Sequence, residues 1–165
     1  MFPWDTLSEA AATARAHPDG IVDLSVGTPV DPVAPVIRAA LADASAVPGY
    51  PWTAGTPELR ASAVSALHRR YGVTGLPENA VLPVIGTKEL IAWLPTLLGL
   101  GAEDLVAVPE LAYPTYEVGA RLAGAQVLAA DSLIQLGPRA PAVMFLNSPS
   151  NPTGVVYSPD ELGAL

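Results

Sequence analysis

The sequence predicts an α/β fold in which helices cover a mostly parallel sheet. From residue 80 onward, short apolar runs typical of buried strands alternate with longer segments of helical spacing. Half of the 165 residues are apolar, which is enough for a sizeable core. The apolar run 142–146 leads directly into a turn-rich stretch that begins at Asn147 and ends at Gly154, as expected where a strand reaches the edge of such a sheet.

Apolar spacing and helix-start signals set the expected elements. Thr56 is placed to cap the helix that starts at Pro57, with an acid in its first turn and two arginines in its last, which suits the helix dipole. Helices are expected at 4–17, 35–46, 57–71, 87–98, 115–123 and from 159, with strands at 21–24, 80–84, 104–108, 126–130 and 142–146. A domain boundary is expected near Val47. The last helix has only about one turn before residue 165, so we expect the chain to be a fragment, with the sheet incomplete at its C-terminus.

Composition excludes several classes of function. The net charge of −8, with seven arginines and one lysine, argues against nucleic acid or an anionic membrane as a partner. The chain has no cysteine and only two histidines, far apart in sequence, so no metal site is expected. No signal peptide is visible, and the apolar segment 90–100 is too short to span a bilayer. We therefore expect a soluble, cytoplasmic protein.

The loop Gly86-Thr87-Lys88 joins an expected strand to an expected helix. Backbone N–H groups and the helix dipole make such a helix start a site for an anion, and the hydroxyl of Thr87 and the charge of Lys88 would add to it. The alternative is an ordinary capped helix with a solvated lysine.

Three tyrosines and two other residues lie in loops where a ligand could bind. Tyr113 and Tyr116 follow a strand end, where an aromatic ring can stack on a flat cofactor or simply pack in the core. Asn151 follows another strand end with an amide that can donate and accept. Tyr50 lies in a Pro/Gly loop and is either an interface anchor or a pinned surface residue. Gly27 allows close approach of a ligand to the backbone, or is a simple turn residue.

Taken together, these segments resemble the N-terminal half of a fold-type I, class I/II aminotransferase. The specific part is the Asn-Pro-Thr-Gly stretch that begins at Asn151, together with the Gly-Thr-Lys loop and the Tyr-Pro-Thr-Tyr segment 113–116. The runs 2–5, 24–29 and 83–90 look closest to actinobacterial succinyldiaminopimelate transaminases of lysine biosynthesis. The resemblance implies the pyridoxal 5'-phosphate (PLP)-dependent transferase fold, with residues 1–46 as an N-terminal arm and part of the small domain. Residues 47–165 would be the first half of the large PLP-binding domain.

The resemblance also implies roles for individual residues. Gly86, Thr87 and Lys88 would hold the cofactor phosphate, with Lys88 also near the substrate. Tyr113 would stack on the pyridine ring, with Tyr116 supporting it, and Asn151 would bond the ring hydroxyl oxygen. Tyr50 would reach the phosphate of a neighbouring subunit, which implies a homodimer. Gly27 would contact the substrate carboxylate.

The family's catalytic centre extends beyond this chain. The resemblance places the Schiff-base lysine, the Asp of the pyridine nitrogen and the Arg of the substrate carboxylate after Leu165, so we expect residues 1–165 alone to be inactive. The whole protein would exchange amino groups between glutamate/2-oxoglutarate and an amino or oxo acid, with N-succinyl-LL-2,6-diaminopimelate as the expected substrate. Alternatives are another PLP enzyme of this fold such as a C–S lyase, a non-catalytic remnant, and a sheet domain with an unrelated anion site.

Overall fold

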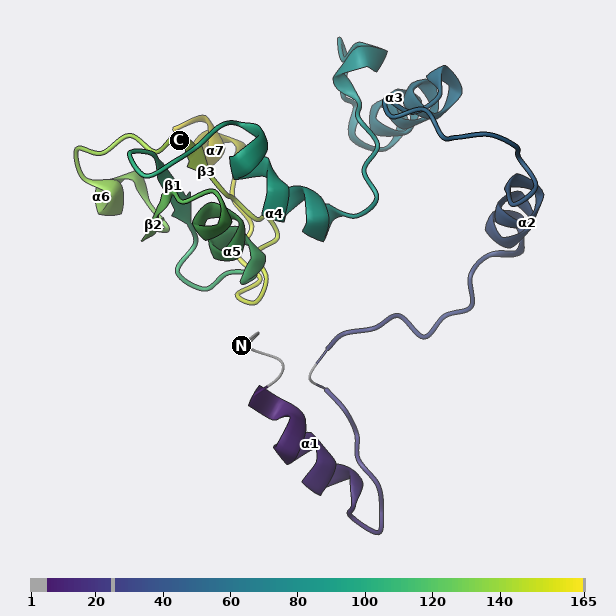
Figure 1. Cartoon of the computed structure of the whole chain (residues 1–165), viewed down its shortest axis with the longest axis horizontal. Helices are drawn as coiled ribbons and strands as arrows, with labels where there is room; N and C mark the ends of the chain where they lie inside the picture. Colours follow the sequence, from purple (N-terminus) through teal and green to yellow (C-terminus); the bar gives the residue numbers. More distant parts are fainter. Residues whose placement is uncertain (1–5, 25, 165) are drawn as a thin grey trace. The chain divides into compact units, whose positions relative to one another are not determined.

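The computed structural model describes residues 6–24 and 26–164, and the chain divides into two compact units, residues 1–81 and 82–165 (Figure 1). The segment 2–5 and Ser25, which contribute to the family resemblance, lie outside the described residues, as does the start of the helix expected from Trp4. The expected division near Val47 stays a prediction. Each unit is described separately below.

The N-terminal unit consists of helices joined by extended segments. Its elements are α1 (Ser8–Arg15), α2 (Pro35–Ala44), α3 (Pro57–Tyr71) and the short 3₁₀ helix η2 (Glu78–Ala80). The strand expected at 21–24 is wrong, because a strand needs a neighbour for its backbone hydrogen bonds and this segment pairs with none in the described part of the chain. Val22 and Leu24 are accordingly exposed, at 84% and 88%.

Helix α3 confirms its predicted bounds, since both of its ends are set by local chemistry. The hydroxyl of Thr56 accepts a hydrogen bond from the backbone N–H of Leu59 at 3.2 Å, and Pro57 stands at the first helical position. At the other end Gly72 adopts a left-handed conformation (φ 69°), in which it ends the helix at little steric cost. Helix α2 likewise begins at its predicted proline.

The C-terminal unit is an α/β layer structure built on a three-stranded sheet. Its elements are α4 (Thr87–Leu97), β1 (Leu105–Val108), α5 (Thr115–Leu122), β2 (Gln126–Ala129), α6 (Leu133–Leu136), β3 (Val143–Met144) and α7 (Pro159–Gly163). The strands are parallel in the order β2-β1-β3, with Val106 opposite Val127 on one side and Val143 on the other. The predicted α/β class with a parallel sheet is therefore confirmed.

Three elements from residue 80 onward differ from the prediction. The strand expected at 80–84 is absent: Val81 has extended backbone angles, but no described segment pairs with it. The short helix α6 was not predicted, because four residues are too few to show a helical period. The strand expected at 142–146 is also shorter, with only Val143 and Met144 in the ladder.

The core of the C-terminal unit lies on both faces of β1, whose side chains alternate between them. Val106 and Val108 pack with Ala120 of α5, whereas Ala107 packs with Ala130 and with Leu136 of α6. Helices α4 and α5 lie side by side (Figure 1) because Gly119 of α5 has no side chain to hold them apart. A Cβ at Gly119 would stand 2.7 Å from the carbonyl oxygen of Ile91.

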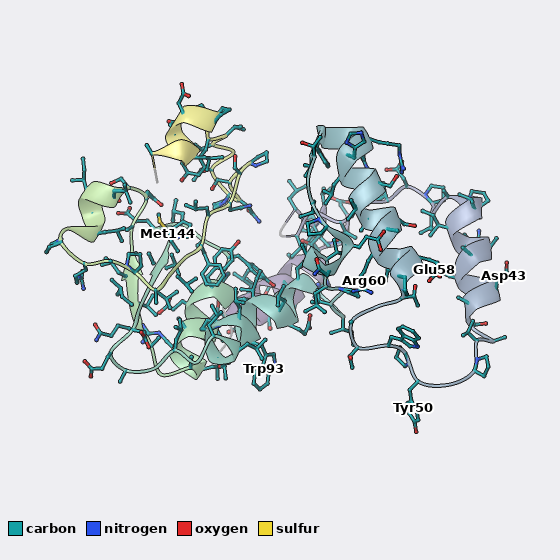
Figure 2. The ribbon with its side chains drawn as sticks, turned by 90° about the horizontal axis from the view of Figure 1, so that it is seen from above. Asp43, Tyr50, Glu58, Arg60, Trp93 and Met144 are labelled. Carbon is teal, nitrogen blue, oxygen red and sulfur yellow. The ribbon has the colours of Figure 1, made fainter. Side chains whose placement is uncertain are left out.

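Much of the apolar surface remains uncovered, so the core is smaller than the composition suggests. Ile85 and Val30 are 98% and 95% exposed, and the indole of Trp93 projects from α4 (Figure 2). Met144, by contrast, packs between elements of the C-terminal unit. No helix within residues 6–24 and 26–164 has the length and apolar character that crossing a membrane requires.

Candidate functional site

The chain adds strands first on one side of β1 and then on the other, and two predicted site segments follow the strands that meet at this point. From β1 the chain passes through α5 to β2 on one side, and then returns across β1 to β3 on the other. In α/β sheets, ligands bind at the carboxyl ends of the strands where the strand order reverses; here that point lies between β1 and β3. Tyr113 follows β1, and the stretch from Asn147 to Asn151 follows β3. The sequence therefore brings these residues to the same edge of the sheet.

Tyr113 belongs to a row of three aromatic rings. Its ring meets that of Tyr116 edge-on, with centroids 6.1 Å apart and an angle of 85° between the planes. Tyr116 in turn stacks on Phe145, at 4.6 Å and 22°. Such contacts fix ring orientation in addition to burying area. Phe145 links α5 to the strand end after β3 and was not singled out from the sequence, because its partner lies 29 positions away by number (145 − 116).

The turn that holds Asn151 is organised by its own hydrogen bonds. The side-chain oxygen of Asn147 accepts from the backbone N–H of Asn151 at 2.8 Å. Ser150 exchanges two more backbone bonds, donating to Val155 at 2.8 Å and accepting from Gly154 at 2.7 Å. The Ser148–Pro149 and Asn151–Pro152 peptide bonds are cis. Asn151 is exposed, so its amide is accessible to a ligand. No role is predicted for Asn147 from the sequence; the signal that could have identified one is its position four residues before Asn151.

Two hollows lie beside these loops. One of about 280 Å³ is lined from the β1 loop by Glu110 and Leu111 and from the β3 turn by Asn147, Ser150 and Thr153. A second, of about 250 Å³, is lined by residues that include Tyr113, Tyr116 and Glu117. The first hollow lies between the loop that carries Tyr113 and the turn that carries Asn151, but it is lined by their neighbours and by neither of these two residues. Its carboxylate, amide and hydroxyl groups suit a polar ligand.

The Gly86-Thr87-Lys88 loop starts α4 as predicted. Gly86 is the N-cap, its carbonyl oxygen accepting from Leu90 N at 3.1 Å, and Thr87 and Lys88 are exposed. No side chain caps this helix start by a hydrogen bond, but the carboxylate of Glu89 lies against Gly86, where a Cβ would collide with it. A negative charge thus already lies beside the backbone N–H groups that we expect to face a phosphate. The loop lines neither of the two hollows described above.

Tyr50 and Gly27 belong to the N-terminal unit. Tyr50 is 99% exposed, and its ring points away from its loop (Figure 2). Gly27 lines an open hollow of about 570 Å³ together with Asp23, Leu24, Val26, Thr28 and Val30, and a Cβ there would meet nothing within 4 Å. Another hollow of about 500 Å³ lies between α1 and a segment that contributes residues 21–24 and Val26; it includes no predicted site residue and is mostly apolar.

One carboxyl group near the end of the described chain has a shifted pKa. Hydrogen bonds from the backbone N–H and then the hydroxyl of Ser158 lower the pKa of Glu161 below its usual 4.5. The two residues form a capping box at the start of α7, with Ser158 Oγ accepting from Glu161 N at 3.2 Å. This is helix-end chemistry rather than a site. Within residues 6–24 and 26–164 no three His, Asp or Glu side chains are grouped to hold a metal ion.

Comparison with known proteins shows which family the chain resembles. The family model for aminotransferase class I and II matches residues 19–165. A protein of Mycobacterium tuberculosis described as a "probable aminotransferase" is 75% identical over 98% of this chain and 39% of its own length. The 4-dedimethylamino-4-oxo-anhydrotetracycline transaminase of Streptomyces rimosus is 56% identical over 98% of this chain and 45% of its own.

A solved structure from Thermus thermophilus, described as a "probable N-succinyldiaminopimelate aminotransferase", superimposes with a TM-score of 0.80. It is 33% identical and covers 94% of this chain and 45% of its own length. The chain thus spans less than half the length of these relatives, and its parallel sheet with flanking helices corresponds to part of the fold-type I architecture. By the family match over residues 19–165, the chain belongs to the class I and II aminotransferases.

Proposed function

We propose that the protein to which this chain belongs is a PLP-dependent transaminase, and that residues 82–165 supply the ring-binding part of its cofactor site. The supporting observation is the convergence of the Tyr113 loop and the Asn147–Asn151 turn around one hollow at the switch point of the sheet. When bound, PLP supplies an electron sink for bond cleavage at the substrate α-carbon.

The residues on this edge match the chemistry of a flat, phosphorylated heterocycle. The ring of Tyr113 is braced by Tyr116 and Phe145 and is proposed to stack on the cofactor ring, fixing its plane. The amide of Asn151, on a turn held by Asn147, is proposed to donate to the ring hydroxyl oxygen.

The phosphate is proposed to bind at the start of α4, where backbone N–H groups, the hydroxyl of Thr87 and the charge of Lys88 favour an anion. Gly86 carries no side chain there, and the atom that a Cβ would meet is the end of a flexible glutamate, which can move. Lys88 is also proposed to lie near the substrate, and Gly27 to contact the substrate carboxylate.

Assembly and organisation follow from the same proposal. The exposed Tyr50 is proposed to reach the phosphate held by a second copy, which makes the protein a homodimer. We propose residues 1–46 as an arm with part of a small domain, residues 47–165 as the first half of the PLP-binding domain, and a cytoplasmic location. The Schiff-base lysine is proposed to lie in sequence that follows this chain, so that residues 1–165 alone do not transaminate.

The proposed reaction exchanges an amino group between N-succinyl-LL-2,6-diaminopimelate and 2-oxoglutarate, which becomes glutamate. The Thermus thermophilus structure supports this substrate at 33% identity. A second candidate has a specific observation in its favour: the transaminase of Streptomyces rimosus, named for a tetracycline intermediate, is more similar at 56%. A ketone on a fused-ring polyketide is therefore the alternative acceptor.

Cofactor binding is tested by quenching of intrinsic fluorescence as PLP is titrated into the chain, with inorganic phosphate and pyridoxal as separate ligands. We expect PLP to bind more tightly than either, and Asn151→Ala to weaken it by about tenfold, the order of one hydrogen bond to a charged group. Asn79→Ala, which changes another exposed asparagine on η2, is the matched control and should bind as the wild type does. Equal affinity for PLP and inorganic phosphate would mean that the chain has an anion site but no site for the cofactor ring.

The reaction is tested on the whole protein. It should convert N-succinyl-LL-2,6-diaminopimelate and 2-oxoglutarate to an oxo acid and glutamate, without release of ammonia. Ammonia as the product would indicate a lyase, and faster turnover of a tetracycline-type ketone would replace the proposed substrate. Activity of residues 1–165 by themselves would contradict the placement of the lysine.

A further inference from the structure

The loop that carries Tyr113 is connected to the neighbouring strand end by a ring of hydrogen bonds. Gln135 makes two of these bonds: its Nε2 donates to Glu110 Oε1 at 2.7 Å, and its Oε1 accepts from the backbone N–H of Asp131 at 2.6 Å. The hydroxyl of Ser132 donates to the same Oε1 at 3.3 Å. Asp131 closes the ring by accepting, through Oδ1, from the backbone N–H of Glu110 at 3.1 Å.

These bonds join segments that are far apart in sequence. Glu110 follows β1, whereas Asp131 and Gln135 follow β2, 21 and 25 positions further on. Both segments lie at the carboxyl edge of the sheet. Helix α6 holds Gln135 in place because the next residue, Leu136, is 4% exposed and packs with Ala107 and Ala130. The ring is therefore anchored in the core on its β2 side.

The β1 loop is consequently held at both ends. At its start, both the backbone N–H and the carboxylate of Glu110 are bonded. At its end, Tyr113 accepts from the backbone N–H of Tyr116 at 3.2 Å and meets its ring. Only Leu111 and Ala112 lie between Glu110 and Tyr113. With so short a span, the position of Glu110 restricts that of the Tyr113 ring.

The chemistry of the ring of bonds selects an amide at position 135. A glutamine donates to one partner and accepts from another through the same side chain. A carboxylate there would face the carboxylate of Glu110 without a proton to share, and an apolar residue would leave both partners to water.

We propose that Gln135 is a positioning residue for Tyr113: through Glu110 and Asp131 it fixes the loop whose tyrosine stacks on the cofactor ring. This rests on the proposed function in that the stacking partner is PLP. It extends the site to α6, a helix that touches neither Tyr113 nor the turn of Asn151 through any contact described above.

The test compares Gln135→Ala with Gln126→Ala in the 165-residue chain. Gln126 is the matched control, an exposed glutamine whose Nε2 donates to Ala102 O at 2.9 Å at the opposite end of β2. We expect Gln135→Ala to accelerate hydrogen exchange at the amides of Glu110 and Tyr116. It should also raise the dissociation constant of PLP by about two- to tenfold, the range for losing one net hydrogen bond. Gln126→Ala should change neither.

Substitutions of Glu110 test whether its hydrogen bond to Gln135 or its negative charge fixes the loop. Glu110→Gln keeps an oxygen that accepts from Gln135 and should retain slow exchange, whereas Glu110→Ala should behave like Gln135→Ala. The double variant Glu110→Ala/Gln135→Ala should be no worse than either single change, because both remove the same bond.

Three results would overturn the proposal. Gln135→Ala could weaken PLP binding no more than Gln126→Ala does, or accelerate exchange at Glu110 without affecting Tyr116, or combine additively with Glu110→Ala. If the wild-type chain binds PLP no more tightly than inorganic phosphate, the proposed function is refuted instead. In that case the exchange measurements at Glu110 and Tyr116 still decide whether Gln135 fixes the loop.

Discussion

Adding one methyl group at Gly119 should destabilise the C-terminal unit, although alanine is the better helix former. An ideal Cβ at this position stands 2.7 Å from the carbonyl oxygen of Ile91, and 2.9 Å and 3.0 Å from the carbonyl oxygen and Cα of Ala92. Real Cβ atoms essentially never approach other atoms below 3.0 Å. All three neighbours are backbone atoms of α4, so the helix must move as a body rather than one side chain rotating away.

The net effect is the difference between two opposing terms. Replacing glycine by alanine inside a helix stabilises by about 1 kcal/mol. Forcing an extra carbon into a packed contact costs about 1–3 kcal/mol. Since the contact at Gly119 involves three backbone atoms, we take the upper half of that range, about 2–3 kcal/mol, and expect a net loss of about 1–2 kcal/mol. With a urea m-value of about 2 kcal/mol/M, the urea midpoint of unfolding falls by about 0.5–1 M.

Urea unfolding followed by circular dichroism measures this change, and Gly163→Ala is the control. Gly163 is also helical, in α7, but a Cβ there meets nothing within 4 Å, so this substitution should leave stability unchanged or raise it slightly. The reasoning is refuted if Gly119→Ala raises the midpoint as Gly163→Ala does, because α4 and α5 would then have room for the methyl group.

Three further results are expected. Thr115→Val should raise the free energy of unfolding by about 1 kcal/mol, because the buried Oγ1 of Thr115 has no partner within the described residues and no hydrogen bond offsets its desolvation. A lower melting temperature of the variant would mean that the hydroxyl is bonded. Hydrogen bonds from Ser158 lower the pKa of Glu161, so its contribution to α7 should be complete above pH 4.5 and lost as pH falls through the lowered folded pKa. A carbon-detected NMR titration that places the pKa of this carboxyl at or above 4.5 would contradict the prediction. Ser158→Ala should reduce the shift without abolishing it, because it removes the hydroxyl but keeps the backbone N–H that donates to Glu161 at 2.8 Å. Asn147→Ala should weaken PLP binding about two- to tenfold, because it removes the 2.8 Å bond that fixes Asn151; unchanged binding would detach the turn from the site.

The sequence was most informative where structure is decided locally. Helix α3 begins and ends as predicted because Thr56, Pro57 and Gly72 act on their own neighbours. The strands expected at 21–24 and 80–84 do not form, because a strand exists only with a partner, and apolar composition cannot show whether one is present. The strand expected at 142–146 is limited to Val143 and Met144 for the same reason, since only these two residues pair with β1.

The candidate site shows the same division. Tyr113 and Asn151 could be placed at a strand edge from the order of strands and turns alone. Phe145, Asn147 and Gln135 could not be assigned, because their roles arise from contacts made only after folding: a stacked ring, a side-chain bond to a turn, and a bridge between two strand ends. Of these, only Asn147 left a visible trace, in its spacing from the second asparagine.

The carboxylate of Glu89 beside Gly86 gives α4 its own counter-ion. A first-turn acid stabilises the positive pole of a helix, so this helix begins without help from outside. A phosphate arriving at the same pole meets a charge of its own sign and must exchange places with it. For the phosphate proposed to bind there, uptake would be a competition between a tethered monoanion and a diffusing dianion. The side chain that stabilises the helix before that exchange also sets the ligand concentration at which the exchange is half complete.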